Sequence, residues 1–189
     1  MNSVVLIEPI TELEQLTALC TEQERLEAEQ LGTAHRKAEY LAWRALLRRE
    51  LGRDIRIGYD EWGGPVVEGS DWHIGVSHSK RMVAVIISRQ PCAIDIEDVS
   101  RNFERVASRY LTDDERRLCS HPELAAVAWC AKETLYKYHR RGGVDFLNDV
   151  RLTAVDIPRG EIRGHILGGE ELTMRLRSEG DYRIVTLGE

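Results

Sequence analysis

Long apolar runs are missing from this sequence. The longest clear one, residues 82–87, is far shorter than the roughly 20 residues that a membrane-spanning helix needs. Low-complexity tracts and long linkers are missing as well. Hydrophobic residues make up 42% of the chain and charged residues 31%, an ordinary balance for a soluble globular protein. We therefore expect a folded protein with no membrane partner.

Cysteines are few and are scattered along the chain. Cys20, Cys92, Cys119 and Cys130 form no C-x-x-C pair, so free thiols in a reducing cytosol are the expected state. The first eight residues contain no basic segment, so they do not resemble a signal peptide. Both observations predict a cytoplasmic protein.

An excess of positive charge is also missing. The formal net charge of -6 at pH 7 argues against a general nucleic-acid binder, but it leaves room for a local basic patch that binds a phosphate-rich small molecule. With 189 residues, the chain is long enough for one large domain or two small lobes with a substantial core.

The segment Ala93–Asp98 alternates apolar and acidic residues, which predicts a strand. Side chains of a strand alternate between its faces, so Ile94 and Ile96 can enter a core while Asp95 and Glu97 project together from the other side. Two neighbouring carboxylates repel each other, and the arrangement is costly unless a cation lies between them. The strand therefore predicts a cation site.

A long helix is predicted over residues 122–140. Its apolar residues fall on one stripe: Leu124, Val127, Ala131, Leu135 and Tyr138. Its polar residues fall on the opposite face: Trp129, Glu133, Lys137 and Arg140. The helix thus adds a third carboxylate and a lysine to the two carboxylates of the strand. Oxygen ligands of this kind suit Mg²⁺, which usually takes one or two carboxylates, keeps waters and binds substrate phosphates.

The two halves of the chain show a similar order of predicted elements. In the first half, strands are expected at 4–7, 55–59, 66–67, 72–77 and 82–88, and helices at 11–20, 21–30 and 33–51. In the second half, strands are expected at 93–97, 150–156, 161–167, 172–177 and 182–187, and helices at 103–110, 113–119 and 122–140. The offset of roughly 90 to 100 residues predicts a mixed α+β protein with two similar lobes, residues 1–91 and 92–189. A cleft between such lobes is a common ligand site.

Residues 93–97 and 129–137 together carry a resemblance to a known family. The Ala-Ile-Asp-Ile-Glu strand and the Trp-Cys-Ala-Lys-Glu-Thr-Leu-Tyr-Lys helix are similar to the paired signature of the 4'-phosphopantetheinyl transferases, a small-x-Asp-x-Glu strand followed by a Trp-x-x-Lys-Glu-x-x-x-Lys helix. The monomeric, two-lobed type that includes the surfactin-synthetase activator is the most similar. This resemblance implies a pseudo-twofold fold, with a long helix on a mostly antiparallel sheet in each lobe and the active site between them.

The resemblance also implies a reaction, that of a holo-acyl-carrier-protein synthase. The phosphopantetheine arm of coenzyme A would pass to a serine of an apo acyl or peptidyl carrier protein in fatty-acid, polyketide or peptide biosynthesis, and 3',5'-adenosine bisphosphate would leave. Asp95, Glu97 and Glu133 would hold Mg²⁺, and Glu133 would also be the general base, either directly or through a metal-bound water. Lys137 would stabilise the pyrophosphate; its alternative is an ordinary helix pair with Glu133.

Two further segments resemble the family's coenzyme A contacts. Residues 34–36 match its Ala-His-Arg, which implies that Arg36 binds a phosphate through its planar fork of donors. Residues 74–79 resemble its Asn-x-Ser-His-Ser, which implies that Ser77 and His78 donate hydrogen bonds to the 3'-phosphate. Lys37 and Arg48, on the same helix as Arg36, are expected to form a solvated basic face.

One departure from the family pattern keeps other functions open. Gly64 stands where the family's Gly-Lys-Pro turn has a lysine, so a phosphate-binding charge is missing unless Lys80 or Arg81 supplies it. A descendant that binds coenzyme A or a carrier without transfer is therefore an alternative. An unrelated magnesium phosphohydrolase is another, and it would need further acidic or histidine ligands.

Residues 101–110 offer a candidate surface for the carrier. Arg101, Arg105 and Arg109 recur every fourth residue, beside an apolar stripe of Phe103, Val106 and Tyr110. A basic stripe of this kind suits an acidic partner helix, and the alternative is a solvated helix whose aromatic residues pack inward. Because one chain would supply both walls of the cleft, we expect a monomer.

Overall fold

The computed structural model describes residues 3–189, apart from the side chains of residues 12–14 and 16. Its strands form two larger antiparallel sheets, ordered β1-β5-β4 and β6-β10-β9-β8-β7, and one small hairpin of β2 and β3. The strands of the first sheet and hairpin are β1 (Val4–Pro9), β2 (Ile57–Tyr59), β3 (Pro65–Val67), β4 (His73–Ser79) and β5 (Met82–Ser88). Those of the second sheet are β6 (Ala93–Asp98), β7 (Val150–Asp156), β8 (Glu161–Ile166), β9 (Leu172–Glu179) and β10 (Tyr182–Leu187).

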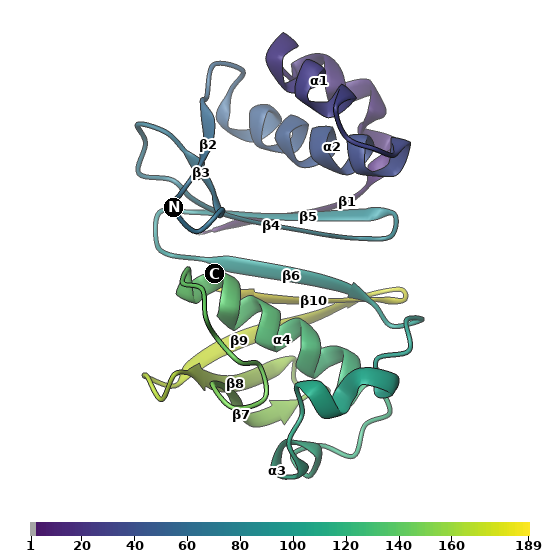
Figure 1. The fold of residues 1–189 in the computed structure, drawn as a ribbon, viewed down its shortest axis with the longest axis vertical. Coiled ribbons are helices and arrows are strands. Elements are labelled where there is room, and N and C mark those ends of the chain that lie inside the picture. The colour runs from purple at the N-terminus through teal and green to yellow at the C-terminus, as the bar shows by residue number, and fades with distance from the viewer. Residues whose placement is uncertain (1–2) are drawn as a thin grey trace.

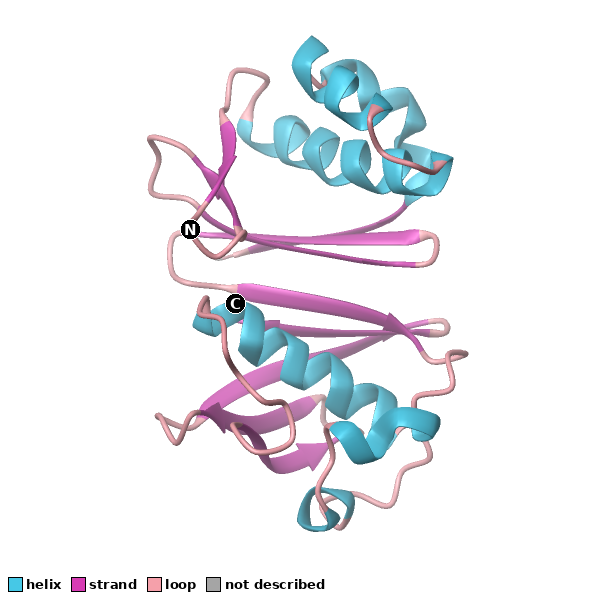
Figure 2. Ribbon diagram, viewed as in Figure 1, coloured by secondary structure: helices cyan, strands magenta, loops and turns pink. Residues whose placement is uncertain are grey.

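Helices connect and cover these strands. The α-helices are α1 (Glu22–Glu29), α2 (Ala34–Leu51), α3 (Asp113–Arg116) and α4 (Leu124–His139), and two 3₁₀ segments are η1 (Ile10–Leu19) and η2 (Glu104–Arg109). In Figures 1 and 2, α2 lies over one face of the first sheet, α4 lies over the far face of the second sheet, and the remaining faces of the two sheets meet in the middle.

The chain buries both faces of β5, which is the apolar run seen in the sequence. Val83 and Val85 pack with α2, whereas Ala84 and Ile86 pack with the second sheet. A strand that is covered on both sides reads as a continuous apolar run, and β5 shows this pattern although its sheet is antiparallel. None of the helices among residues 3–189 is long and apolar enough to cross a membrane.

The acidic strand β6 alternates as predicted. Ile94 and Ile96 lie in the cluster between the two sheets, together with Ile184 of β10. Asp95 and Glu97 therefore face α4. Since both carboxylates are buried there, the helix that packs over them decides what they contact.

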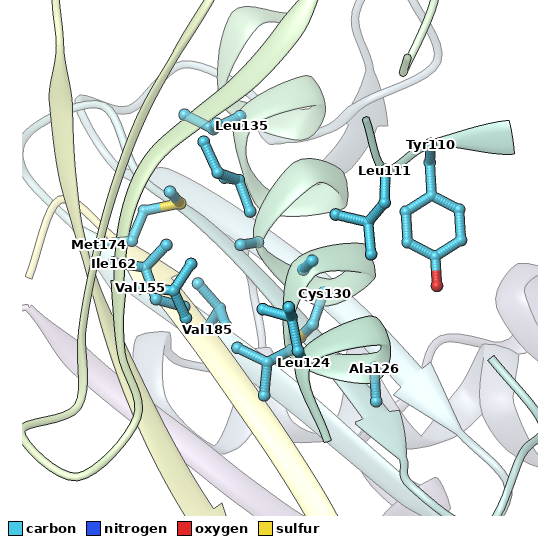
Figure 3. Close-up of a cluster of buried hydrophobic side chains, with 14 of the residues drawn as sticks. Tyr110, Leu111, Leu124, Ala126, Cys130, Leu135, Val155, Ile162, Met174 and Val185 are labelled. Carbon is cyan, nitrogen blue, oxygen red and sulfur yellow. The ribbon is translucent and has the colours of Figure 1, made fainter. Parts of the chain in front are cut away.

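The helix α4 is attached to the second sheet by the largest hydrophobic cluster (Figure 3). Leu124 and Leu135 contribute to this cluster from the helix, while Ile162 and Met174 contribute from β8 and β9. Burial of side chains of this size stabilises a fold by about 1.5–3 kcal/mol each. The packing fixes the rotation of α4, so its opposite face meets β6 and the first sheet.

The mixed α+β class with antiparallel sheets is confirmed, and most elements fall within a few residues of their predicted ranges. The segment 103–110 was expected to be helical and contains only the short 3₁₀ segment η2, and α3 is shorter than the expected 113–119. The chain leaves the first sheet at Ser88 and enters the second at Ala93. The division into lobes of residues 1–91 and 92–189 stays a prediction.

Candidate active site

Serine side chains of β4 join the two sheets where the candidate site lies. The Ser77 hydroxyl donates to Oδ1 of Asp95 at 2.7 Å and accepts a hydrogen bond from the backbone N–H of Ile96 at 3.3 Å. Two residues further on, the Ser79 hydroxyl donates to Oε2 of Glu97 at 3.3 Å. Both serines share one face of β4, because alternate residues of a strand point the same way. These contacts place the acidic strand directly against the first sheet.

Asp95 is buried, with only 4% of its surface exposed. Its Oδ1 accepts hydrogen bonds from Ser77 and from Nζ of Lys137, each at 2.7 Å. Its Oδ2 is buried too and accepts no hydrogen bond from the N–H and O–H groups described among residues 3–189. The Asp95 carboxylate also interacts with the buried thiol of Cys130, whose pKa it helps to raise. An unpaired polar atom in the interior costs about 1–3 kcal/mol, and more when it is charged. Oδ2 therefore marks a position that a cation or a donor from a ligand would complete.

Glu97 is buried as well, and its oxygens are already bonded. Oε1 accepts from Nε1 of Trp129 at 2.9 Å, and Oε2 accepts from Arg101 at 2.6 Å. Burial and the negative charge of Asp95 raise the pKa of Glu97, against the opposing effects of Arg101 and Trp129. Glu97 thus adds negative charge to the site while its side chain is directed toward α4 and the loop after β6.

Glu133 lies on the face of α4 that meets β6, and it is half-buried. Burial, followed by repulsion from Asp95, raises its pKa to about 7, although the nearby Lys137 acts in the opposite direction. Among residues 3–189, no side chain or backbone group donates a hydrogen bond to its carboxylate. A carboxyl group of this kind exchanges its proton near neutral pH, as a general base must.

Lys137 crosses from α4 to the strands. Its Nζ contacts Oδ1 of Asp95 at 2.7 Å and the backbone oxygens of Ile94 and Val76 at 3.3 and 3.5 Å. Burial lowers its pKa, but Asp95, Glu133 and Cys130 together outweigh this effect, so the net pKa of Lys137 is raised. The described contacts therefore do not support an ordinary helix pair with Glu133, the alternative considered for this lysine.

The donor chemistry of this site fits a magnesium ion. In the described part of the chain, no group of three or more His, Cys, Asp or Glu side chains is placed to hold a metal ion. However, Oδ2 of Asp95 and the carboxylate of Glu133 are oxygens without donors, and Mg²⁺ usually takes only one or two carboxylates beside waters and substrate phosphates. The predicted set of Asp95, Glu97 and Glu133 stays a prediction.

Two cavities meet beside Lys137. The turn cavity, about 330 Å³, is bounded by the turn of residues 60–65, by β4 and by the end of α4. The histidine cavity, about 390 Å³, is lined by Trp43, Tyr59, Pro65, Val76, Ser77, His78, Asp95 and Lys137. Pro65, Val76 and Lys137 line both. A long ligand could therefore extend from one cavity into the other past the amine of Lys137.

Arg140, at the end of α4, holds the turn of residues 60–65 in place, and this turn forms one wall of the turn cavity. Its Nη1 lies 3.0 Å from Oδ2 of Asp60, and its Nη2 donates to the backbone oxygen of Ile74 at 3.1 Å. Asp60 in turn accepts from the backbone N–H groups of Trp62 and Gly64 at 2.9 and 2.8 Å. Arg140 has a left-handed backbone, with φ 51°, which is uncommon for a residue other than glycine.

A family comparison decides the class of the protein. The family described as the 4'-phosphopantetheinyl transferase superfamily matches residues 91–186, just over half of the chain. The chain belongs to the 4'-phosphopantetheinyl transferase superfamily. A comparison with curated proteins finds no match. The matched residues contain the acidic strand and α4, so the family assignment rests on the half that carries the carboxylates and Lys137.

The residues expected to bind coenzyme A lie in the other half and are only partly brought together. Ser77 and His78 line the histidine cavity, although the single proton of Ser77 is donated to Asp95. Nδ1 of His78 lies 2.9 Å from Glu39, which also contacts His35 at 3.0 Å. Arg36 is exposed in the first turn of α2 and lines neither cavity, so its role stays a prediction.

The expected solvated face of α2 is wrong for Arg48. This guanidinium is buried and forms two hydrogen bonds to Glu24 of α1, at 2.9 and 3.1 Å. The sequence does not show that α1 covers this side of α2, so a buried arginine looked like a surface residue. Lys37 is less enclosed and pairs with Glu29 at 2.6 Å.

The lysine that the resemblance leads us to expect at position 64 is not replaced by Lys80, which pairs with Asp98 at 2.9 Å. A Cβ at Gly64 would lie 2.9 Å from Oδ2 of Asp60, so any other residue at this position would displace the Asp60 carboxylate. The positive charge near the turn comes instead from Arg140 and Arg141, which line the turn cavity. The sequence placed Arg140 on the polar face of the helix but gave no signal of its contact with Asp60.

The candidate carrier surface differs from a regular helix. Arg101 lies before η2 and pairs with Glu97, while Arg105 and Arg109 are exposed. Phe103 and Tyr110 are buried, as in the alternative in which the aromatic residues pack inward. Three arginines spaced by four do not align along a 3₁₀ segment, because it has three residues per turn.

Proposed function

We propose that this protein is a magnesium-dependent 4'-phosphopantetheinyl transferase that uses coenzyme A to convert apo carrier proteins to their holo form. The carrier serine oxygen attacks the β-phosphorus of the coenzyme A pyrophosphate, the bond to the leaving phosphate breaks, and 3',5'-adenosine bisphosphate leaves. The observation that carries the proposal is the buried Asp95 Oδ2 without a partner, placed beside Glu133 and Lys137 in a chain of this superfamily.

In this proposal the carboxylates have different roles. Asp95 and Glu133, with Glu97 close by, would hold the ion, which when bound neutralises charge on the pyrophosphate oxygens. Glu133 would accept the proton of the carrier serine, because no group among the described residues donates a hydrogen bond to its carboxylate. Asp95 keeps Lys137 in place through the 2.7 Å contact.

Lys137 would stabilise the pyrophosphate as charge develops on it. Its Nζ is fixed by Asp95 and two backbone oxygens at the junction of the two cavities. An ammonium held in advance at the reacting phosphate does not need to reorganise during the reaction, which makes its electrostatic contribution large.

The two cavities would hold the remainder of coenzyme A. The histidine cavity offers His78 to the 3'-phosphate, and Arg36, in the first turn of α2, would add a second phosphate contact. Binding through Ser77 requires its hydroxyl to leave Asp95, to which it donates here. The turn cavity would take the base, between the turn of residues 60–65 and the end of α4.

The proposal extends to organisation and setting. Residues 1–91 would form the lobe that binds the nucleotide, and residues 92–189 would form the lobe that carries the metal and the catalytic helix, in a monomer of the surfactin-synthetase-activator type. The carrier would dock near the exposed Arg105 and Arg109, and the reaction would take place in the cytoplasm.

Intact-mass measurement tests the proposal. Apo acyl and peptidyl carrier proteins are incubated with the protein, coenzyme A and MgCl₂, and a gain of one phosphopantetheine unit is expected on at least one of them. Asp95→Ala should abolish this gain. Coenzyme A binding with no mass gain on any carrier would instead support the non-catalytic descendant, which Gly64 favours because it removes a basic residue from the turn.

A further inference from the structure

Glu39 of α2 lies between two imidazoles that belong to different parts of the fold. Its Oε1 is 3.0 Å from Nε2 of His35, one turn earlier on the same helix, and 2.9 Å from Nδ1 of His78 on β4. The Glu39 side chain is 13% exposed, whereas the two histidine side chains are 55% and 46% exposed. The carboxylate is therefore the enclosed member of the group.

The arrangement places the imidazole of His78 between Glu39 and the histidine cavity. His78 lines this cavity and Glu39 does not. Because Nδ1 of His78 is occupied by the carboxylate, its Nε2 is the nitrogen left for a ligand. The other ionisable side chains around the cavity are Tyr59 from β2, Asp95 from β6 and Lys137 from α4.

Hydrogen-bond chemistry then restricts what His78 can bind. A neutral imidazole has one donor and one acceptor, so a ring that donates from Nδ1 to Glu39 presents an acceptor at Nε2. A phosphate oxygen needs a donor there, and the imidazolium supplies donors at both nitrogens. With Glu39 on one side and a phosphate on the other, both donors of the imidazolium are used.

We propose that Glu39 is a positioning residue for the nucleotide: its carboxylate orients His78 so that Nε2–H meets the 3'-phosphate of coenzyme A. This inference rests on the proposed function. His35 contacts the same oxygen of Glu39 from the other side, at 3.0 Å. The same logic operates when a carboxylate orients a catalytic histidine.

Glu39 acts here through His78 and does not repel the phosphate directly, because the imidazole stands between the carboxylate and the cavity. Removal of its charge should therefore weaken binding of the 3'-phosphate. If Glu39 only repelled the ligand, removal of its charge would tighten binding. The sign of the effect separates these two roles.

The test uses two nucleotides that differ only in the 3'-phosphate, 3',5'-adenosine bisphosphate and adenosine 5'-monophosphate. Calorimetry on the wild-type protein should show tighter binding of the bisphosphate. Glu39→Gln should weaken the bisphosphate about tenfold, the size of one lost charge-assisted hydrogen bond, and leave the monophosphate nearly unchanged. Glu50→Gln, the same change at the far end of α2, is the matched control and should alter neither.

Imidazole nitrogen spectra give a second readout, which a general loss of stability would not produce. In the complex with the bisphosphate they should show His78 protonated at both nitrogens in the wild-type protein, and this doubly protonated form should be lost in Glu39→Gln. Glu39→Asp keeps the charge, but its side chain is shorter by one methylene and should contact His78 less well. Its bisphosphate affinity should therefore lie between those of the wild-type protein and Glu39→Gln.

The outcomes separate the inference from the function on which it rests. If Glu39→Gln still prefers the bisphosphate over the monophosphate as strongly as the wild-type protein does, the proposed role of Glu39 is wrong. Tighter bisphosphate binding by that variant would also overturn this role, and neither result would overturn the proposed function. Equal binding of the two nucleotides by the wild-type protein would overturn the 3'-phosphate site and, with it, the inference.

Discussion

Lys132 and Glu133 are neighbours on α4, yet their side chains enter opposite surroundings. Lys132 is fully buried and pairs with Glu115 at 2.8 Å, and it also donates to the backbone oxygen of Phe146 at 2.9 Å. Oε1 of Glu115 accepts a further hydrogen bond from the backbone N–H of Leu152 at 2.9 Å. Every charge on this side of the helix has its partners within the chain.

On the side of α4 that carries Glu133, by contrast, some carboxylate oxygens have no partner within the described residues. Oδ2 of Asp95 is buried without a partner, and the pKa of Glu133 is raised to about 7 by burial and by the charge of Asp95. Of the cations at the site, Arg101 pairs with Oε2 of Glu97 and Lys137 pairs with Oδ1 of Asp95. The difference teaches that one helix can secure the fold with one face and leave the other face to be completed by ligands.

The largest effect should follow from removal of the carboxylate on the incomplete face. Glu133→Gln keeps the shape of the side chain but removes the proton acceptor, so the rate of carrier modification should fall by about 10²–10⁴-fold. Initial rates measured by intact mass check this, and far-UV circular dichroism should show an unchanged fold. A rate within a few-fold of wild type would show that the carrier serine loses its proton to another group.

The matched change on the complete face should act on stability. Lys132→Met leaves Glu115 buried without its cation, and loss of one member of a buried pair costs about 3–5 kcal/mol. The free energy of unfolding in urea checks this, with Glu133→Gln as the control that should not be destabilised. If the two variants unfold at the same urea concentration, the proposed division of α4 into two faces is wrong.

The pH dependence of stability should sharpen the comparison. Glu133 has a folded-state pKa of about 7, above its ordinary value of 4.5, so the folded state binds the proton more tightly than the unfolded state. Its contribution to stability is then fully present below pH 4.5 and is lost as the pH rises through 7, by about 3 kcal/mol in total. The metal-free wild-type protein should lose this stability relative to Glu133→Gln between pH 4.5 and 7.

This pH difference has a clear contrary outcome. The unfolding free energies of the two proteins, measured in EDTA at several pH values, should approach each other as the pH falls and diverge as it rises. Parallel curves would mean that Glu133 titrates as an exposed carboxyl does, and that its surroundings do not prepare it to act as a base.

The smallest effect concerns the turn cavity. Arg140→Ala removes the clamp on Asp60, so the turn of residues 60–65 should loosen and coenzyme A should bind about tenfold more weakly, as expected for a lost charge-assisted contact. Arg141→Ala removes a charge from the same cavity without breaking that contact and should have a smaller effect. If both variants lose the same coenzyme A affinity, Arg140 contributes only its positive charge and its contact with Asp60 has no role in binding.

Local pattern predicted the elements that carry the site, because alternation in β6 and the apolar stripe of α4 are properties of short segments. It predicted Asp95 and Glu97 on one face of the strand β6, and Glu133 and Lys137 on one face of the helix α4. In the structure these two faces lie next to each other. The comparison with the family supports the same half of the chain.

Contacts between distant segments could not be predicted in this way. Arg140 meets Asp60, and Glu39 meets His78, only because the two sheets and α2 come together in the folded chain. The pairing of Arg48 with Glu24 was missed for the same reason, since a helical pattern does not reveal what covers each face. Sequence motifs predicted which groups take part, and these packing contacts decide how the groups are held.

A divalent cation is expected to bind between Asp95 and the face of α4 that carries Glu133. Calorimetric titration of MgCl₂ into the protein saturated with coenzyme A tests this claim most directly. The wild-type protein should bind the ion with saturable heat, and Asp95→Asn should lose most of this affinity while coenzyme A binding persists. Equal Mg²⁺ affinity in the two proteins would contradict the account.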